Sequence, residues 1–191
     1  RVLDYFAGGG YYSELLARTV GPGGSVIVYN NALYAKFAGE KLTQRFAGNR
    51  LANAKAVTLE TDALQLEPNS LDGAMFVISY HDLYLPPKEA PAKPANIGEI
   101  TKALFQAVKP GGVVLVVDHA ANPGGDTINI ASTLHRIDPK VVRDDFTKAG
   151  FTFDGESEAL RNSTDDRSKM VFDPEVRGKT DQFIYRFRKP G

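Results

Sequence analysis

Histidine is the residue type in this sequence best suited to proton transfer, and it occurs three times. Cysteine is absent, which removes disulfides, thiolate metal ligands and cysteine nucleophiles, so acid–base work falls on His81, His119 and His135. His81 and His119 each follow an apolar stretch typical of a buried strand, and each has an aspartate beside it, Asp82 or Asp118. A single histidine at a strand end is more often a hydrogen-bonded surface residue. Because two such pairs occur, we predict His81, Asp82 and His119 as catalytic.

The same side chains could also bind a metal ion, because histidine and carboxylate are common ligands of divalent ions. No ligand spacing among His81, Asp82, Asp118 and His119 singles out such a site. From the sequence we therefore predict no metal.

A glycine-rich segment near the start of the chain could bind a cofactor. Asp4 lies in a short apolar strand, and Gly8, Gly9 and Gly10 follow it ahead of an expected helix. The dinucleotide fingerprint G-x-G-x-x-G fails here, because its third glycine position holds Ser13. The Asp4 carboxylate would repel a pyrophosphate but would attract the ammonium and sulfonium groups of S-adenosylmethionine. The loop therefore favours S-adenosylmethionine over NAD, and a tight turn without a ligand is the alternative.

Strands and helices alternate along the chain, and these elements must position the residues above. The expected strands cover residues 2–6, 26–29, 56–59, 73–78, 113–117, 151–153 and 182–187, and the expected helices cover 12–20, 34–46, 97–108 and 139–148. Leu15, Leu16 and Val20 should form the inner face of the first helix. The pattern predicts an α/β fold: a Rossmann-like, doubly wound, mostly parallel sheet of about seven strands with an antiparallel edge strand, in a three-layer α/β/α sandwich. In such sheets ligands bind at the carboxyl ends of the strands, near the point where the strand order reverses.

Composition and charge exclude several classes of protein. The chain has 191 residues, is 42% hydrophobic, and carries 23 basic and 23 acidic residues, for a formal net charge of zero. This balance argues against a dedicated nucleic-acid binder, and no apolar stretch reaches the roughly 18 residues that span a bilayer. We expect one domain over residues 1–191 with a small-molecule partner, in the cytoplasm. Because the chain begins at Arg1 without Met, we expect a preceding segment to be missing, and a periplasmic location stays open.

The stretch from Ser157 to Asp181 is long and polar. It holds five basic and six acidic residues, a near balance that predicts internal salt bridges.

Several motifs resemble those of the class I S-adenosylmethionine-dependent methyltransferases. The similar segments are motif I at residues 2–10, residues 20–24, the strand that ends at Asn30, Asp62 after the third strand, and residues 108–112 before the fifth. The whole chain is also similar to a bacterial group of predicted methyltransferases without an assigned substrate, through residues 79–84, 134–136, 161–162 and 177–181.

The resemblance implies a binding site for S-adenosyl-L-methionine. The residues expected to contact it are Asp4, Phe6, Ala7, Gly8, Gly9, Gly10, Asn30, Asp62, Ala63 and Ser79. Asp4 and the loop would hold the methionine portion, and Asp62 and Ala63 would face the adenine. Asn30 stands where the family usually has an acidic residue for the ribose hydroxyls, and Phe6 stands where it often has glycine.

We also expect an acceptor site. Tyr80 and Tyr84 could shape the acceptor pocket, although tyrosines near a loop are more often partly buried packing residues, and His135, Arg136 and Arg161 are candidate groups for an anionic acceptor. Residues 79–82 lack the Asn-Pro-Pro-Tyr motif of family members that methylate planar amino groups, so bases and glutamine are not the expected acceptors. The proline-rich stretch 85–96 could be a lid or a plain connection.

We therefore expect an enzyme that transfers a methyl group from S-adenosylmethionine to an unidentified small or medium molecule. A non-catalytic domain that binds this cofactor or a nucleoside is the alternative. A nicotinamide oxidoreductase is disfavoured by Ser13 and Asp4.

Overall fold

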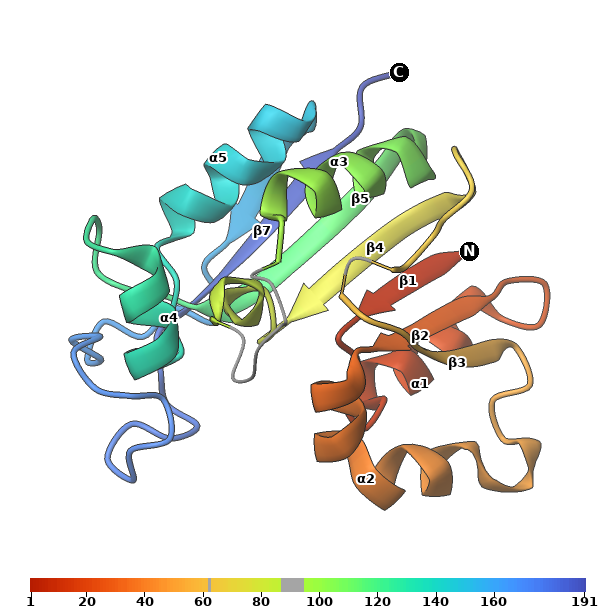
Figure 1. The fold of residues 1–191 in the computed structure, drawn as a ribbon, viewed down its shortest axis with the longest axis horizontal. Coiled ribbons are helices and arrows are strands. Elements are labelled where there is room, and N and C mark those ends of the chain that lie inside the picture. Colours follow the sequence, from red (N-terminus) through yellow and green to blue (C-terminus); the bar gives the residue numbers. More distant parts are fainter. Residues whose placement is uncertain (62, 87–94) are drawn as a thin grey trace.

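The computed structural model describes residues 1–61, 63–86 and 95–191. Within them, seven strands form one sheet: β1 (Val2–Tyr5), β2 (Val26–Asn30), β3 (Ala54–Thr58), β4 (Leu71–Val77), β5 (Val108–His119), β6 (Thr152–Ser157) and β7 (Gln182–Arg188) (Figure 1). Their order is β3-β2-β1-β4-β5-β7-β6. Neighbours from β3 to β5 pair in parallel, and β7 is antiparallel to β5 and β6. The predicted doubly wound, mostly parallel sheet is confirmed, with β7 one place in from the edge and β6 outside it.

Helices cover both faces of this sheet (Figure 1). They are α1 (Tyr11–Val20), α2 (Ala32–Phe46), α3 (Ile97–Ala107), α4 (Thr127–Leu134) and α5 (Pro139–Ala149), with short 3₁₀ turns η1 (Ala47–Asn49) and η2 (His81–Tyr84). Strand β2 shows why two layers are needed, because successive side chains of a strand point to opposite faces. Val26 and Val28 pack with Ala17 of α1, whereas Ile27 and Tyr29 belong to the larger core on the other face.

The strand order reverses between β1 and β4, which are neighbours in the middle of the sheet. From β1 the chain adds β2 and β3 on one side, and from β4 it adds the later strands on the other. Neighbouring strands at such a reversal lead into helices on opposite faces, so their carboxyl ends open a crevice. Most of the predicted cofactor-binding and catalytic residues lie at or just after the carboxyl ends of β1, β2, β4 and β5, and the fold gathers these at this edge of the sheet. His135, Arg136 and Arg161 come from later segments of the chain.

The inner face of α1 differs from the prediction. Leu15 is 44% exposed, whereas Ser13 and Ala17 are buried. The reason is polar: the Ser13 hydroxyl donates a hydrogen bond to the buried Asp4 carboxylate, which turns this face of the helix toward β1. Hydrophobic spacing alone therefore placed Leu15 on the wrong side.

The sequence-based prediction missed one further element and made another too short. Helix α4 was not predicted; Asp126 caps it by accepting hydrogen bonds from the backbone of Ile128 and Asn129. Strand β5 begins at Val108 and not at Val113 as predicted. Residues 110–112, expected to end the preceding helix, instead form an irregularity within the strand, where the pairing with β4 shifts between Leu71 and Gly73.

Ion pairs hold the polar segment between β6 and β7, as the charge balance predicted. Arg136 pairs with Asp165 at 2.8 Å, and Arg161 and Arg167 both pair with Asp181, at 2.9 and 2.8 Å. Among the described residues, no helix is long and apolar enough to cross a membrane.

Candidate functional site

The loop after β1 makes a tight turn into α1. Gly8 and Gly10 have φ angles of 54° and 75°, which glycine adopts without steric penalty. Phe6 has a φ of 57°, which costs a residue with a Cβ about 1–2 kcal/mol. Arg45 of α2 fixes the loop from outside by donating a hydrogen bond to the Gly9 carbonyl at 2.8 Å. The glycine-rich turn expected from the sequence is present, and its strained position is Phe6.

Asp4 is buried beneath this loop. Its carboxylate accepts a hydrogen bond from the Ser13 hydroxyl at 2.5 Å. Burial raises the pKa of Asp4 to about 6, against smaller opposing effects of the hydrogen bonds from Ser13. A cationic group brought to this carboxylate would favour its charged form.

Asn30, at the end of β2, is bound to the loop itself. Its side-chain oxygen accepts from the Gly8 N–H at 2.8 Å, and its side-chain amide donates to the Gly8 carbonyl at 3.0 Å. The side chain is 1% exposed. In this arrangement Asn30 stabilises the turn, and its amide is directed at protein atoms where the resemblance implied ribose hydroxyls.

A pair of aromatic rings joins the loop after β1 to the residues after β4. The Tyr34 ring of α2 stacks on Phe6 with centroids 4.5 Å apart and planes 15° apart. The Tyr34 hydroxyl donates a hydrogen bond to Asp82 Oδ2. We call this pair the Phe6–Tyr34 bridge; it spans the crevice between the carboxyl ends of β1 and β4.

Asp118, at the end of β5, orients His81 in η2. Its Oδ1 lies 2.8 Å from His81 Nδ1, and its Oδ2 accepts from the His81 backbone N–H at 2.9 Å. Burial lowers the pKa of His81, but the charge and hydrogen bond of Asp118, with the charge of Asp82, outweigh it and raise the pKa above its usual value. With Nδ1 held by Asp118, the second ring nitrogen of His81 is directed toward Asp82.

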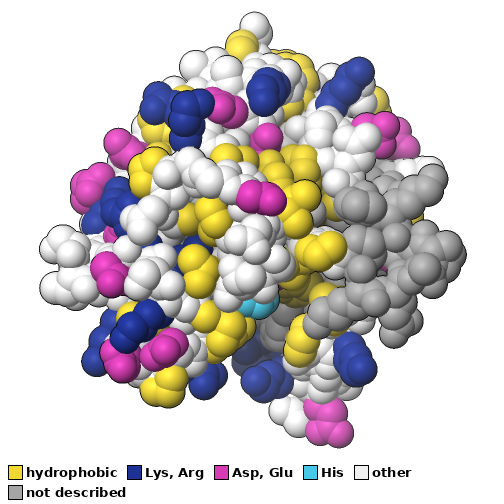
Figure 2. Space-filling model, turned by 60° about the vertical axis from the view of Figure 1, so that its left-hand side comes forward, with side chains coloured by type: hydrophobic (Ala, Val, Ile, Leu, Met, Phe, Trp, Pro, Cys, Tyr) yellow, Lys and Arg dark blue, Asp and Glu magenta, His cyan; other side chains and the backbone are white. Residues whose placement is uncertain are grey.

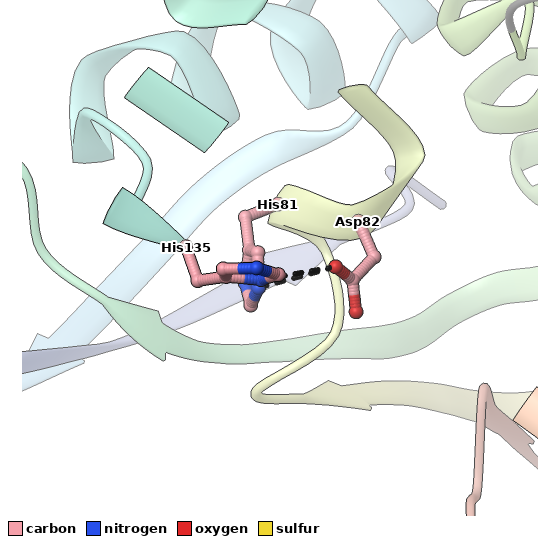
Figure 3. Close-up of side chains that lie close together, drawn as sticks. All are labelled: His81, Asp82 and His135. Atoms are coloured by element: carbon pink, nitrogen blue, oxygen red, sulfur yellow. Dashed lines mark ion pairs between the residues drawn. The ribbon is translucent and has the colours of Figure 1, made fainter. Parts of the chain in front are cut away.

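His135, at the end of α4, completes a cluster with His81 and Asp82 (Figure 3). Asp82 Oδ1 lies 3.3 Å from His81 Nε2 and 3.7 Å from His135 Nδ1. His81 is buried, whereas Asp82 and His135 are half-buried. Figure 2 shows a small patch of histidine surface beside hydrophobic side chains. We call these three residues the His81 cluster.

His119 lies next to the cluster but has a different environment. Its ring is 6.1 Å from that of His81, and its Nδ1 lies 2.7 Å from the Thr180 hydroxyl of the segment before β7. Burial lowers the pKa of His119 to about 4. This side chain is neutral near pH 7 and is a weaker base than His81.

Tyr80 and Tyr84 turn toward α5. Both hydroxyls donate to Asp145, at 2.9 and 2.5 Å, and the Tyr80 ring is fully buried against Phe76 and Phe146. The structure does not bring either hydroxyl to the His81 cluster.

Arg136 and Arg161, expected near an anionic acceptor, are also occupied. Arg136 is fully buried, and its guanidinium donates to Asp165 and to the carbonyls of Ala120 and Lys169. Arg161 binds Asp181 through two nitrogens. Of the three expected acceptor groups, only His135 lies in the cluster.

The expected adenine side is partly described. Asp62 lies outside the described residues, and Ala63 is exposed in the loop after β3. The Ser79 hydroxyl, fully buried, donates to the Tyr5 carbonyl at 3.3 Å. A cavity of about 140 Å³ lies nearby, lined by Tyr5, Thr61, Leu64, Leu66 and residues of α3. This is smaller than the roughly 300–1,000 Å³ of typical ligand pockets.

Tyr34 was missed in the sequence as a site residue. It lies near the start of α2, where an aromatic residue is usually part of the core, and only the crossing to Asp82 gives it a further role. Asp118 was noticed beside His119, and its side chain accepts from the His119 backbone N–H, but it also orients the ring of His81, 37 residues away.

No protein-family model and no curated protein matches the chain. Solved structures do match it. A SAM-dependent methyltransferase from Aquifex aeolicus has a TM-score of 0.63 and 17% identity, over 97% of this chain and 80% of that one. A SAM-dependent methyltransferase from Methanosarcina mazei has a TM-score of 0.63 and 19% identity, over 99% and 92%.

A [4+2]-cyclase is equally similar, with a TM-score of 0.64 and 16% identity over 100% of this chain and 74% of that one. At these identities the likeness concerns the fold, which hosts more than one reaction. With its strand order and its matches over nearly the full chain, the protein has the fold of the class I S-adenosylmethionine-dependent methyltransferases.

Proposed function

We propose that the chain binds S-adenosyl-L-methionine at the carboxyl ends of β1 and β2 and transfers its methyl group to a small or medium molecule beside the His81 cluster. The observation that carries this proposal is the Phe6–Tyr34 bridge, because one tyrosine side chain separates the glycine loop from Asp82. A ligand on the loop and an acceptor at the cluster would therefore be close neighbours.

The charge of the loop region supports a cofactor that carries a cationic amino acid portion. Asp4 is buried, and its hydrogen-bonding partner Ser13 is neutral. An ammonium group near the loop would stabilise the Asp4 carboxylate, whereas a pyrophosphate would be repelled by it.

Methyl transfer depends mainly on how the cofactor and the acceptor are positioned relative to each other. The methyl group passes in line from the sulfonium sulfur to an oxygen or nitrogen of the acceptor, and the cofactor leaves as a neutral thioether. Holding the two molecules in contact supplies much of the rate enhancement. The acceptor atom loses a proton, and the His81 cluster offers the nearest groups that can favour this loss, with Asp118 fixing the orientation of His81.

A second candidate function is binding without transfer. It is favoured by two observations: Asn30 directs its amide at the Gly8 peptide, and Tyr34 spans the crevice. In this case the chain would hold the cofactor or a nucleoside, and the Tyr34 hydroxyl would keep its bond to Asp82.

Incubation with methyl-labelled S-adenosylmethionine and a panel of metabolites tests the two candidates. Transfer predicts label in a product and a loss of rate of about 10²-fold or more in Asp118→Asn, because the variant no longer orients His81 with a charge. Cofactor binding without label in any product would instead favour the binding domain. Equal rates in Asp118→Asn and the parent protein would remove His81 from the mechanism.

A further inference from the structure

We propose that His81, Asp82 and His135 bind one divalent transition-metal ion, through Nε2 of His81, Oδ1 of Asp82 and Nδ1 of His135. This proposal replaces the sequence-based expectation of no metal, and it rests on the geometry of the three side chains (Figure 3).

The two separations from Asp82 Oδ1 fit an ion better than they fit direct hydrogen bonds. One ligand atom from each residue lies within 4.8 Å of the other two. Asp82 Oδ1 is 3.3 and 3.7 Å from the two histidine nitrogens, longer than the roughly 2.7–3.2 Å of an N–H···O hydrogen bond. Two atoms that each lie about 2.1 Å from a tetrahedral ion are about 3.4 Å apart.

The groups around the cluster orient its ligands as the surroundings of metal sites do. Histidines that bind metals usually donate their other ring N–H to a carboxylate, which fixes the ring and its tautomer. Asp118 holds His81 Nδ1 in this way at 2.8 Å. The Tyr34 hydroxyl bonds Asp82 Oδ2, which leaves Oδ1 directed at the two histidines.

The charge of the cluster also favours a cation. Asp118 is fully buried and Asp82 is half-buried, and within the described part of the chain both carboxylates pair with histidines and neither with a lysine or arginine. A divalent ion would neutralise both carboxylates.

Two imidazoles and one carboxylate favour Zn²⁺, Fe²⁺ or Co²⁺ over Mg²⁺ and Ca²⁺, which prefer oxygen ligands alone. Three protein ligands leave a coordination position free for another molecule. We place an oxygen of the methyl acceptor there, which names a hydroxyl-bearing small molecule as the acceptor class. The ion would lower the pKa of that hydroxyl, whose proton leaves to solvent as the oxygen takes the methyl group. This last step rests on the proposed methyl transfer, whereas ion binding does not.

Calorimetric titration of the chelator-treated chain with Zn²⁺, Co²⁺ and Mg²⁺ tests the site without any cofactor. We expect one Zn²⁺ or Co²⁺ per chain, with little or no affinity for Mg²⁺. His135→Ala and Asp82→Asn should each weaken binding at least 10-fold, and Asp118→Asn, which removes a supporting carboxylate, about 10- to 100-fold. His119→Gln is the matched control, because it changes the one histidine outside the cluster and should leave the affinity for the ion unchanged.

Circular dichroism establishes that each variant is folded, and half-buried His135 is the substitution most easily tolerated. Loss of Zn²⁺ binding in folded His135→Ala but not in His119→Gln supports the site. Equal binding in both variants, or none by the parent chain at millimolar ion, overturns it. A chain that binds Zn²⁺ but no S-adenosylmethionine would keep the ion site and contradict only the proposed methyl transfer.

Discussion

Asp82 is the residue on which the contacts of the crevice converge. It accepts a hydrogen bond from Tyr34, and its other oxygen faces His81 and His135. Burial raises the pKa of Asp82, but the contacts with His135, His81 and Tyr34 outweigh it, so the carboxyl stays ionised. The same side chain thus links the proposed cofactor loop to the proposed acceptor position.

At Phe6, backbone strain opposes aromatic packing. Its left-handed backbone costs about 1–2 kcal/mol. Its ring contacts Tyr34, Tyr29 and Tyr5 with centroids 4.5, 5.7 and 4.9 Å apart. Such pairs each contribute about 0.5–1.5 kcal/mol beyond burial, so packing outweighs the strain.

Asp4 predicts how cofactor affinity depends on pH. Burial raises its pKa to about 6, and an ammonium group prefers the ionised carboxylate. Below pH 6 the carboxyl must lose a proton before it can bind, so affinity should rise by up to about tenfold per pH unit toward 6 and level off above it. Titration of S-adenosylhomocysteine from pH 5 to 7.5 measures this.

Asp4→Asn is the control for the pH series. The amide keeps the size of the side chain and loses the titrating group, so binding should be weaker and flat with pH. A parent chain whose affinity is also flat over this range would show that Asp4 does not contact the charged end of the cofactor.

At the scale of elements, buried ion pairs fix the long segment between β6 and β7 against the sheet. Arg136 follows α4 and reaches Asp165, and the Asp181 backbone N–H donates to the same carboxylate at 2.7 Å. The Arg136–Asp165 pair therefore also supports the end of the segment at Asp181, next to Thr180 and His119.

Removal of the Arg136 guanidinium should destabilise this segment strongly. Arg136→Ala leaves a buried Asp165 without its partner, and we expect a loss of about 3–5 kcal/mol in the free energy of unfolding, measured in urea. Lys169→Ala breaks an exposed pair with Glu175 in the same segment and should cost far less, because solvent screens an exposed pair. Similar losses in both variants would refute the structural role of Arg136.

The sequence predicted which segments form helices and strands better than it predicted which face of each element is buried. Val26–Tyr29 is continuously apolar, and β2 is buried on both sides as predicted. Helix α1 was predicted almost to its ends, but Leu15 is exposed because the Asp4–Ser13 hydrogen bond sets the rotation of the helix. Hydrophobic periodicity does not contain such a polar contact, and α4, a short helix after a glycine-rich turn, gives too few periods to detect.

At the scale of the whole molecule, strand order decides which residues can meet. The sequence indicates that His81 and His119 follow neighbouring strands, and the structure places their rings 6.1 Å apart. The sequence does not indicate that His135 and Tyr34, which lie outside the strand ends, would reach Asp82, as they do in the structure. Those contacts depend on how α4 and α2 pack over the sheet edge, which is a tertiary property.

Calorimetric titration of the intact chain with S-adenosylmethionine, S-adenosylhomocysteine and NADH tests the central proposal most directly. The account predicts one site per chain for both sulfur compounds, with a Kd well below about 1 mM, that is, at least about 4 kcal/mol of binding free energy, and no site for NADH. Tyr34→Phe, which frees Asp82 from the bridge, should bind at least as tightly as the parent chain. Failure of both sulfur compounds to bind at millimolar concentration would contradict the proposed function.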